Sequence, residues 1–293
     1  MNTKLILNYL RSVLALMLGF LLSLLPMGSP RIPHSNRLRL VWADEFDGNS
    51  LDPAKWEGHF CGSGAANPAV RRGSYWTTDM ATVKDGTLHI RTEYYPEGYN
   101  GNGKPGWYTC GIDTNDLFEQ TYGYFEVRCI LPKGVGLWSA FWMISDSMSF
   151  ASGYGEIEGS GADGSEIDIF ESAYYETKYP NRVASTIHYD GYGEWHRSKT
   201  ICEPFILNND PYEEFNTYGF EWNENGYIFY VNGIETGRTD FGGVTQVPEH
   251  MILSVEVGGN GAVPAKDWTG GPLTEDCEVT DFIVDYVRAY QYK

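Results

Sequence analysis

Three carboxylates lie close together in residues 164–172, at Glu166, Asp168 and Glu171. A β-strand alternates its side chains between two faces, so Glu166 and Asp168 would share one face. Strict alternation would put Glu171 on the opposite face, where burying its charge among apolar neighbours is costly. A β-bulge at Ile169–Phe170 would return Glu171 to the face of the other two acids. We therefore predict a bulged strand that carries all three carboxylates on one face.

This pattern suits the hydrolysis of a glycosidic bond. Glu166 and Glu171 would be roughly 13 Å apart between Cα atoms, and side chains that lean together can bring their carboxyl groups to about 5 Å, the separation in retaining glycosidases. Repulsion among three acids raises the pKa of at least one of them. One glutamate can then stay protonated as the acid while the other is ionised as the nucleophile, and Asp168 can hydrogen-bond to the nucleophile.

Two other interpretations are an acidic strand edge exposed to solvent and a calcium site. Calcium usually takes ligands from loops, with backbone carbonyls among them. Carboxylates that alternate with isoleucine along a strand fit such a site poorly, so we favour catalysis.

Short alternating runs dominate the rest of the chain, and they predict an all-β fold. Residues 124–131 alternate between two faces, and in residues 138–144 the even positions share a face. Asn225-Gly226 and Asn232-Gly233 predict two successive hairpin turns. Many short strands with regular turns are typical of a sandwich or jelly roll, and we expect residues 36–293 to form one domain.

The N-terminal segment has the pattern of an export signal. Lys4 and Arg11 precede an apolar run from Val13 to Leu25, which is shorter than the ~20 residues of a comfortable membrane span. Because residues 27–30 are not a clean cleavage site, we assign residues 1–35 as a signal peptide, with an uncleaved N-terminal anchor as the alternative. We expect a secreted or extracellular protein that meets a membrane only if this segment is retained.

The charge balance limits the partners of the chain. Its formal net charge of −18 disfavours nucleic acid and anionic lipid, and weakly disfavours heavily sulfated glycans. A neutral polysaccharide is not disfavoured, and the 9 tryptophans and 21 tyrosines could supply rings that stack on sugars as well as a core. We expect a monomer whose partner is a polysaccharide substrate.

The chain has five cysteines, an odd number that leaves at least one thiol without a partner in the chain. Export would permit disulfides, but the sequence does not give their pairing. No C-x-x-C motif or cluster of cysteine and histidine suggests a zinc site.

The carboxylate segment resembles the signature of glycoside hydrolase family 16, in its bulged Glu-x-Asp-x-x-Glu form. Further segments resemble strands of that family in the same order along the chain, at Val41–Gly48, Tyr122–Arg128, Gly136–Trp142 and Asp285–Arg288. The resemblance implies an all-β, concanavalin-like jelly-roll sandwich with a substrate cleft on its concave sheet.

The resemblance also implies roles for the acids: Glu166 as nucleophile, Asp168 as its helper and Glu171 as acid/base. Bulged members of the family include laminarinases and agarases, so we expect a retaining endo-1,3(4)-β-glucanase. The alternatives are an agarase-like hydrolase, a transglycosylase and a non-catalytic lectin on the same fold. Ser139 and Glu256 depart from the residues that many laminarinase-like members have, which leaves the linkage of the substrate open.

Five further residues are candidates for substrate binding. Trp138 and Trp142 share a strand face and could stack on sugar rings or belong to the core. Arg128 could bind a sugar hydroxyl or orient a carboxylate, or form a structural ion pair. The resemblance places His188 beside the donor site, although it could be a structural histidine, and Trp195 could form a positive subsite.

Members of the family often bind one structural calcium ion on the convex side. The resemblance would place its ligands at Glu45, Gly86 and Asp285. Asp285 has apolar neighbours two residues away on its strand, so a buried carboxylate there would need a cation or hydrogen-bond donors. The reaction itself requires no cofactor.

Overall fold

A computed structural model describes residues 32–293 except 63, 65, 150–158, 175–181 and 208. The chain divides into two units, Met1–Pro33 and His34–Lys293, and the strands described below all belong to the second. The apolar run at residues 13–25, on which the predicted signal peptide or anchor depends, lies outside the described residues. In the part of the chain that is described, no helix is long and apolar enough to cross a membrane.

Two antiparallel sheets, each with eight strands among the described residues, make up most of the second unit. The first, called the β22 sheet, contains in spatial order β18 (Ile234–Thr239), β17 (Gly226–Val231), β16 (Asn216–Asn223), β11 (Gly123–Ile130), β22 (Phe282–Tyr292), β6 (Thr87–Ile90) and β5 (Ala81–Lys84), with β1 (Leu38–Asp44) also paired to β22. The second, called the β13 sheet, contains β15 (Arg197–Ile206), β14 (Arg182–Tyr189), β13 (Ser165–Ala173), β12 (Leu137–Ile144), β19 (Glu249–Val257), β9 (Gly111–Asp113) and β2 (Glu57–Gly58), with β10 (Glu119–Gln120) paired to β19.

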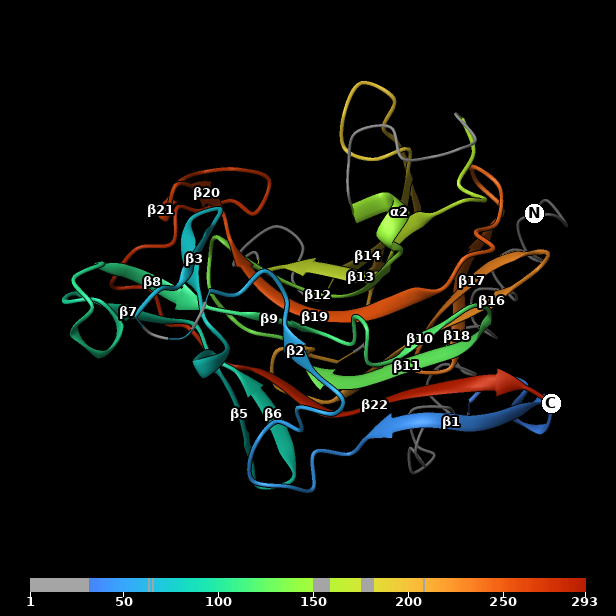
Figure 1. Ribbon diagram of the computed structural model, residues 1–293, viewed down its shortest axis with the longest axis horizontal. Helices are drawn as coiled ribbons and strands as arrows, with labels where there is room; N and C mark the ends of the chain where they lie inside the picture. The colour runs from blue at the N-terminus through green and yellow to red at the C-terminus, as the bar shows by residue number, and fades with distance from the viewer. Residues whose placement is uncertain (1–31, 63, 65, 150–158, 175–181, 208) are drawn as a thin grey trace, which may run out of the picture. The chain divides into compact units, whose positions relative to one another are not determined.

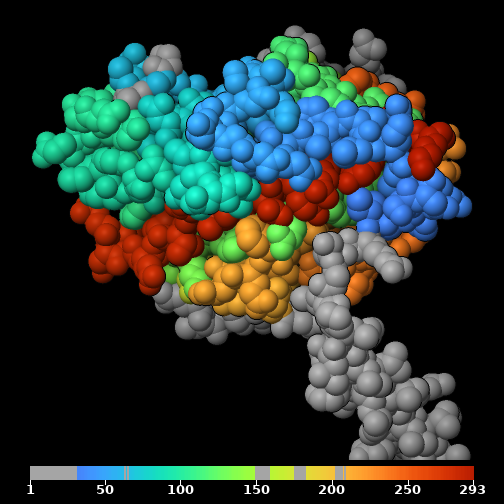
Figure 2. Space-filling model, turned by 90° about the horizontal axis from the view of Figure 1, so that it is seen from below, coloured from blue at the N-terminus to red at the C-terminus, as the bar shows by residue number. Residues whose placement is uncertain are grey.

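Smaller elements connect and flank these sheets. They are the sheet of β3 (Ala69–Arg71), β4 (Ser74–Trp76), β8 (Gly106–Thr109) and β7 (Glu93–Tyr95), the pair β20 (Gly259–Asn260) and β21 (Val263–Pro264), the 3-10 helices η1 (Ser35–Arg37), η2 (Thr78–Met80) and η3 (Tyr99–Gly101), and the short helix α2 (Asp146–Ser149). Figure 1 shows β12, β13 and β19 in one layer and β1, β11 and β22 in the layer below it. Figure 2 shows the lower face, where the segment that contains β1 (blue) lies beside the C-terminal segment (red), as their pairing requires.

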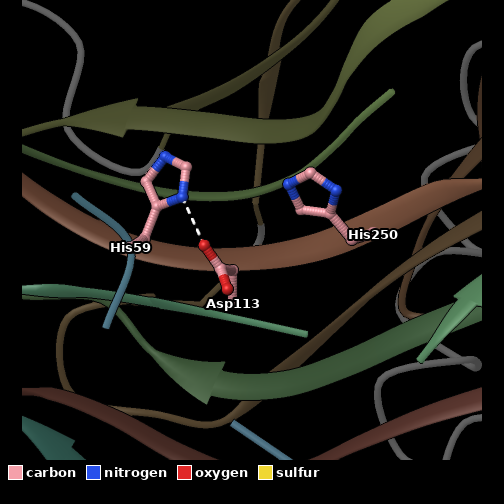
Figure 3. Close-up of side chains that lie close together, drawn as sticks. All are labelled: His59, Asp113 and His250. Atoms are coloured by element: carbon pink, nitrogen blue, oxygen red, sulfur yellow. Dashed lines mark hydrogen bonds and ion pairs between the residues drawn. The ribbon is translucent and has the colours of Figure 1, made fainter. Parts of the chain in front are cut away.

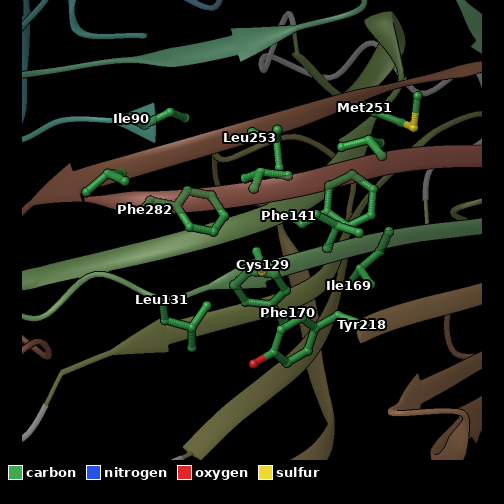
Figure 4. Close-up of a cluster of buried hydrophobic side chains, with 14 of the residues drawn as sticks. Ile90, Cys129, Leu131, Phe141, Ile169, Phe170, Tyr218, Met251, Leu253 and Phe282 are labelled. Carbon is green, nitrogen blue, oxygen red and sulfur yellow. The ribbon is translucent and has the colours of Figure 1, made fainter. Parts of the chain in front are cut away.

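The core lies between the two large sheets (Figure 4). The β13 sheet contributes Phe141 and Leu253, and the β22 sheet contributes Cys129, Tyr218 and Phe282, all at most 1% exposed. Alternation explains this arrangement, because each strand turns every second side chain toward the opposite sheet. The all-β fold predicted from the sequence is confirmed.

The two predicted hairpins join neighbouring strands of the β22 sheet. Val231 pairs with Ile234, so Asn232-Gly233 forms the two-residue turn between β17 and β18. Both turn residues have positive φ, 51° and 74°, which asparagine and glycine tolerate best. The preceding hairpin joins β16 to β17, where Gly226 pairs with Asn223, so its two turn residues are Glu224 and Asn225, one position before the predicted Asn225-Gly226.

Candidate active site

Strand β13 carries the predicted bulge. Phe141 of β12 pairs with Phe170, whereas the next residue, Trp142, pairs with Asp168, so Ile169 has no partner in β12. Ile169 and Phe170 are adjacent in sequence and both lie in the core, 3% and 0% exposed. Two consecutive inward side chains shift the alternation by one residue, as a bulge does.

The bulge places Glu171 on the same face of β13 as Glu166 and Asp168. All three carboxylates line a cavity of about 380 Å³ on the side of the β13 sheet that faces away from the core. This cavity, called the cleft, is lined by His59, Phe60, Arg71, Arg72, Trp138, Ala140, Trp142, Ile144, Glu166, Asp168, Glu171, Tyr192, Ser254 and Glu256.

Burial dominates the electrostatics of the three acids. It raises the pKa of Asp168 to about 8. Burial, followed by the charge of Asp168, raises the pKa of Glu171 to about 8 and raises the pKa of Glu166 well above its ordinary range. His188 opposes the shift of both glutamates because its positive charge favours a carboxylate. The cleft therefore favours proton-bearing carboxyl groups near neutral pH.

His188 on β14 lies directly beside these acids. Its Nε2 is 3.1 Å from Asp168 Oδ2 and 3.8 Å from Glu166 Oε1. Its other ring nitrogen, Nδ1, is 2.9 Å from Nε2 of His196, and the two rings are nearly parallel, with an interplanar angle of 4°. Tyr192 donates its hydroxyl proton to Glu166 Oε2. His188 thus connects the acid strand to a second imidazole on the following loop.

The two tryptophans of β12 lie in the cleft rather than between the sheets. Trp138 and Trp142 both line it, only 4% and 6% exposed. The Trp142 indole donates to Ser254 Oγ over 3.1 Å. The guanidinium of Arg72 lies 5.0 Å from the centre of the Trp138 ring, a cation–π arrangement that holds the indole in place.

Glu256, which the sequence singled out as an extra carboxylate, lines the cleft from β19. Arg71 donates to its Oε1 from Nε and Nη2 over 2.9 and 2.6 Å, and Arg72 Nε lies 2.7 Å from its Oε2. Glu256 is therefore bound between two arginines, which fixes their positions in the cleft.

Comparisons with known proteins agree with this geometry. The sequence model of a family described as "Beta-porphyranase A-D, GH16 domain" matches residues 40–292. The chain belongs to glycoside hydrolase family 16. It is therefore a glycoside hydrolase, and the predicted resemblance is confirmed.

Relatives and solved structures of the family cover most of this family 16 chain. A beta-glucanase of Rhodothermus marinus is 29% identical and covers 95% of this chain and 94% of its own length. Beta-porphyranase B of Zobellia galactanivorans is 26% identical, with 91% and 88% coverage. The crystal structure of a non-specific endo-beta-1,3(4)-glucanase from family GH16 has a TM-score of 0.67 at 26% identity, over 91% of this chain and 95% of that one. The predicted jelly-roll sandwich is thereby confirmed.

Two predicted substrate contacts of this family 16 chain are not found in the cleft. Arg128 lies on β11 in the other sheet, where its Nη1 donates to Asp285 over 2.6 Å and its guanidinium lies 4.4 Å from the Phe215 ring centre. The prediction that it binds substrate is wrong, and the structural ion pair is what forms. Trp195 lies in the loop after β14 with 50% of its surface exposed, and the described residues that line the cleft do not include it.

The predicted calcium ligands do not fit a cation. Glu45 accepts two hydrogen bonds of 2.7 Å from Arg288, and Asp285 accepts one from Arg128. Arginine supplies the donors that Asp285 needs, so its carboxylate requires no metal. Gly86 follows Asp85 in the turn between β5 and β6 and has a φ of 76°.

Several residues of the cleft were not predicted from the sequence. They are His59, Phe60, Arg71, Arg72, Tyr192 and Ser254. One signal was present, since Arg71 and Arg72 form an adjacent basic pair in a chain with 39 acidic and 21 basic residues. The remaining four come from loops and from strands whose pairing with the acid strand no local pattern reveals.

Proposed function

We propose that this family 16 member is a retaining endo-hydrolase of β-glucan, acting on β-1,3 or mixed β-1,3(4) linkages. The observation that carries the proposal is the set of Glu166, Asp168 and Glu171 on one wall of an open cleft. A lectin would bind sugar without needing three buried acids whose pKa values are raised, since burying charge costs free energy. The beta-glucanase and endo-beta-1,3(4)-glucanase relatives support the substrate class.

The reaction proceeds by double displacement. The Glu166 carboxylate attacks the anomeric carbon, the bond from that carbon to the glycosidic oxygen breaks, and Glu171 gives its proton to the leaving oxygen. A water molecule then gives a proton to Glu171, its oxygen attacks the same carbon, and the Glu166 carboxylate is released. Two inversions at one carbon retain its configuration.

The two roles require opposite protonation states. Glu171 has a pKa of about 8 and so keeps the proton that an acid must donate. Glu166 and Asp168 compete for one proton, because the charge of Asp168 raises the pKa of Glu166. We place the proton of this pair on Asp168. The Tyr192 hydroxyl donates to Glu166, and this hydrogen bond stabilises Glu166 as the ionised nucleophile.

Trp138 and Trp142 supply ring faces for sugar binding. Trp142 pairs with Asp168 in the neighbouring strand, so a sugar on its ring lies beside the catalytic acids. Trp138 pairs with Ala173, farther along the cleft, where the Arg72 guanidinium lies over its ring. An aromatic wall that continues along one strand suits a polysaccharide bound in its interior, as an endo-acting enzyme requires.

A specific observation favours a second candidate, hydrolysis of porphyran. The family model that matches residues 40–292 is described as beta-porphyranase, and a porphyranase relative covers 91% of the chain. The cleft also contains Arg71 and Arg72, although both contact Glu256. The net charge of −18 and the glucanase relatives lead us to rank β-glucan first.

A substrate panel tests the proposal and separates these candidates. Purified enzyme is incubated with laminarin, lichenan, porphyran, agarose, carrageenan and xyloglucan, and new reducing ends are counted. We expect laminarin to be cleaved faster than agarose and carrageenan, with a series of oligosaccharides among the early products. Fastest release from porphyran would favour the second candidate, products longer than the starting oligosaccharide would indicate a transglycosylase, and binding without cleavage would indicate a lectin.

We further propose that the enzyme is exported and acts outside the cell. The support is the basic and apolar pattern of residues 1–35. Expression of the whole chain in a bacterial host, with activity measured in medium, periplasm, membranes and cytosol, tests this. A processed enzyme outside the cytosol is expected, activity that stays with the membrane would indicate a retained anchor, and unprocessed cytosolic enzyme would refute export.

A further inference from the structure

Three buried residues from distant parts of the chain meet beside the cleft (Figure 3). His59 follows β2, Asp113 ends β9 and His250 lies near the start of β19. Each is at most 5% exposed. His59 Nδ1 is 2.5 Å from Asp113 Oδ2, and in Figure 3 a ring nitrogen of His250 faces this pair. One ligand atom from each residue lies within 4.8 Å of the other two.

We propose that His59, Asp113 and His250 form a binding site for one divalent transition metal of the zinc class. Two imidazoles and one carboxylate are a donor set that Zn²⁺ accepts, with a solvent molecule as a fourth ligand. Calcium and magnesium prefer oxygen ligands, which makes them poor occupants of a site with two nitrogens. No sequence pattern predicted this site, because its ligands are 54 and 137 residues apart and share no motif.

The environment of His250 points to a ligand beyond the hydrogen-bonded pair. In Figure 3 its Nε2 faces His59 and Asp113, whereas its Nδ1, which is buried without a hydrogen-bond partner among the described residues, lies on the far side of the ring. Buried polar groups in proteins are nearly always paired, yet no hydrogen bond joins this imidazole to the His59–Asp113 pair within the described part of the chain. A metal bound by Nε2 of His250, Nδ1 of His59 and the Asp113 carboxylate would give the imidazole a partner.

The site needs only a small adjustment to accept the ion. Two ligand atoms at about 2.1 Å from a tetrahedral metal lie about 3.4 Å apart, so the contact between His59 and Asp113 must lengthen by roughly 1 Å. The Asp113 carboxylate can turn to do this, because among the described residues its second oxygen accepts one hydrogen bond, from the Asn115 amide at 3.2 Å. The proton that His59 shares with Asp113 is released to solvent.

The residues around the three ligands predict a moderate affinity for zinc, and His59 connects the metal site to the cleft. Ligating histidines usually donate their outer nitrogen to a second group, and loss of such a group weakens binding about 10–100-fold. In the part of the chain that the structure describes, neither the outer Nε2 of His59 nor the outer Nδ1 of His250 has that partner, so we expect a micromolar dissociation constant. The His59 ring lines the cleft and contacts Trp142 edge-on, with centroids 5.2 Å apart. A bound metal would therefore fix one side of the sugar-binding surface.

Zinc titration of the whole enzyme, first stripped with a chelator and dialysed, tests the proposal. We expect one equivalent of Zn²⁺ to bind, and Tm to rise by about 5 °C at roughly a hundredfold excess over Kd. His250→Gln and Asp113→Asn should each weaken binding by about 100-fold. X-ray absorption of the zinc complex of His188→Gln, which lacks the His188–His196 pair, should still show two imidazole ligands, and this tests the site even if a variant of His250 or Asp113 fails to fold.

Two control variants distinguish this site from other histidine–carboxylate pairs. His89 lies 2.9 Å from Asp281 but has no second imidazole there, so His89→Gln should bind zinc as the wild type does. His188, Glu166 and Asp168 also lie close enough together to hold an ion, and His188→Gln should keep the zinc affinity. Loss of binding in His188→Gln but not in His250→Gln, or no binding by wild type at about 1 mM Zn²⁺, would overturn the proposal.

Discussion

The acid/base residue Glu171 has its pKa raised to about 8 by burial and then by the charge of Asp168. A general acid must carry its proton, so we predict that kcat/KM falls as pH rises through about 8. Glu171→Gln should lower kcat by about 10²–10⁴-fold on substrates with poor leaving groups and should abolish this fall. The pH dependence of both enzymes on an oligosaccharide substrate measures this, and a basic limb that persists in Glu171→Gln would assign it to another group.

The raised pKa of Asp168 predicts that the stability of the protein depends on pH. Its pKa in the folded protein is about 8, above its ordinary value of 3.8. Because this pKa is higher in the folded than in the unfolded protein, protonated Asp168 contributes fully to stability below the unfolded pKa. That contribution is lost as pH rises through the folded pKa. Asp168→Asn mimics the protonated form at every pH, so we predict a Tm about 5 °C above wild type at pH 8 and little difference at pH 4. Thermal unfolding at both pH values measures it, and a lower Tm at pH 8 would contradict the assigned shift.

The bulge in strand β13 turns the side chain of Glu171 toward the cleft. Phe170 is fully buried against Tyr218, with ring centroids 4.4 Å apart. Phe170→Ala keeps the bulge and should cost about 3–5 kcal/mol in free energy of unfolding through the lost packing. Deleting Phe170 restores simple alternation, so Glu166, Asp168 and Glu171 still share a face, with Glu171 slightly displaced. We predict that the deletion enzyme folds with much reduced but measurable activity.

Urea unfolding and initial rates of both Phe170 variants measure these effects. Full activity in the deletion enzyme would show that the bulge does not set the position of the acid. A deletion enzyme that cannot fold, beside a folded Phe170→Ala enzyme, would show that the bulge is needed first for packing.

Local sequence patterns predicted the strands that carry the acids and the tryptophans of the site, but they did not predict which side chains from other strands would join them. The bulge followed from the cost of burying Glu171, and the shared face of Trp138 and Trp142 followed from strand alternation. Arg128 was misplaced because a polar strand face has the same pattern whether it borders a cleft or the opposite surface. Only the pairing of β11 with β22, which brings Arg128 beside Asp285, decides between them.

At the scale of the whole molecule, the all-β class and the family were accessible from the sequence, whereas contacts between distant segments were not. Arg71 and Glu256 are 185 residues apart and meet because β19 and the β3–β4 turn border the same cleft. The arginines that pair with Glu45 and Asp285 are likewise far from them in sequence, so the sequence did not reveal that both carboxylates have donors. Long-range pairing is set by the packing of whole sheets, which a local pattern does not encode.

The net charge of −18 predicts how the rate of hydrolysis responds to salt. A neutral glucan has no charge for the surface to repel, so kcat/KM on laminarin should change by less than about twofold between low and high salt, where charges are screened. An anionic polysaccharide should instead respond steeply to salt. Initial rates in graded NaCl measure this, and a steep response with laminarin would indicate that charged groups contribute directly to binding it.

Azide rescue distinguishes a nucleophile at Glu166 from an acid/base at Glu171. Glu166→Ala and Glu171→Ala are each given an activated aryl β-glucoside oligosaccharide and sodium azide, and the configuration of the glycosyl azide is read by NMR. We predict the inverted α-azide from Glu166→Ala, because azide displaces the leaving group in one step, and the retained β-azide from Glu171→Ala, because azide attacks the covalent intermediate. The opposite pair of products, or wild-type turnover by Glu166→Ala without azide, would contradict the account.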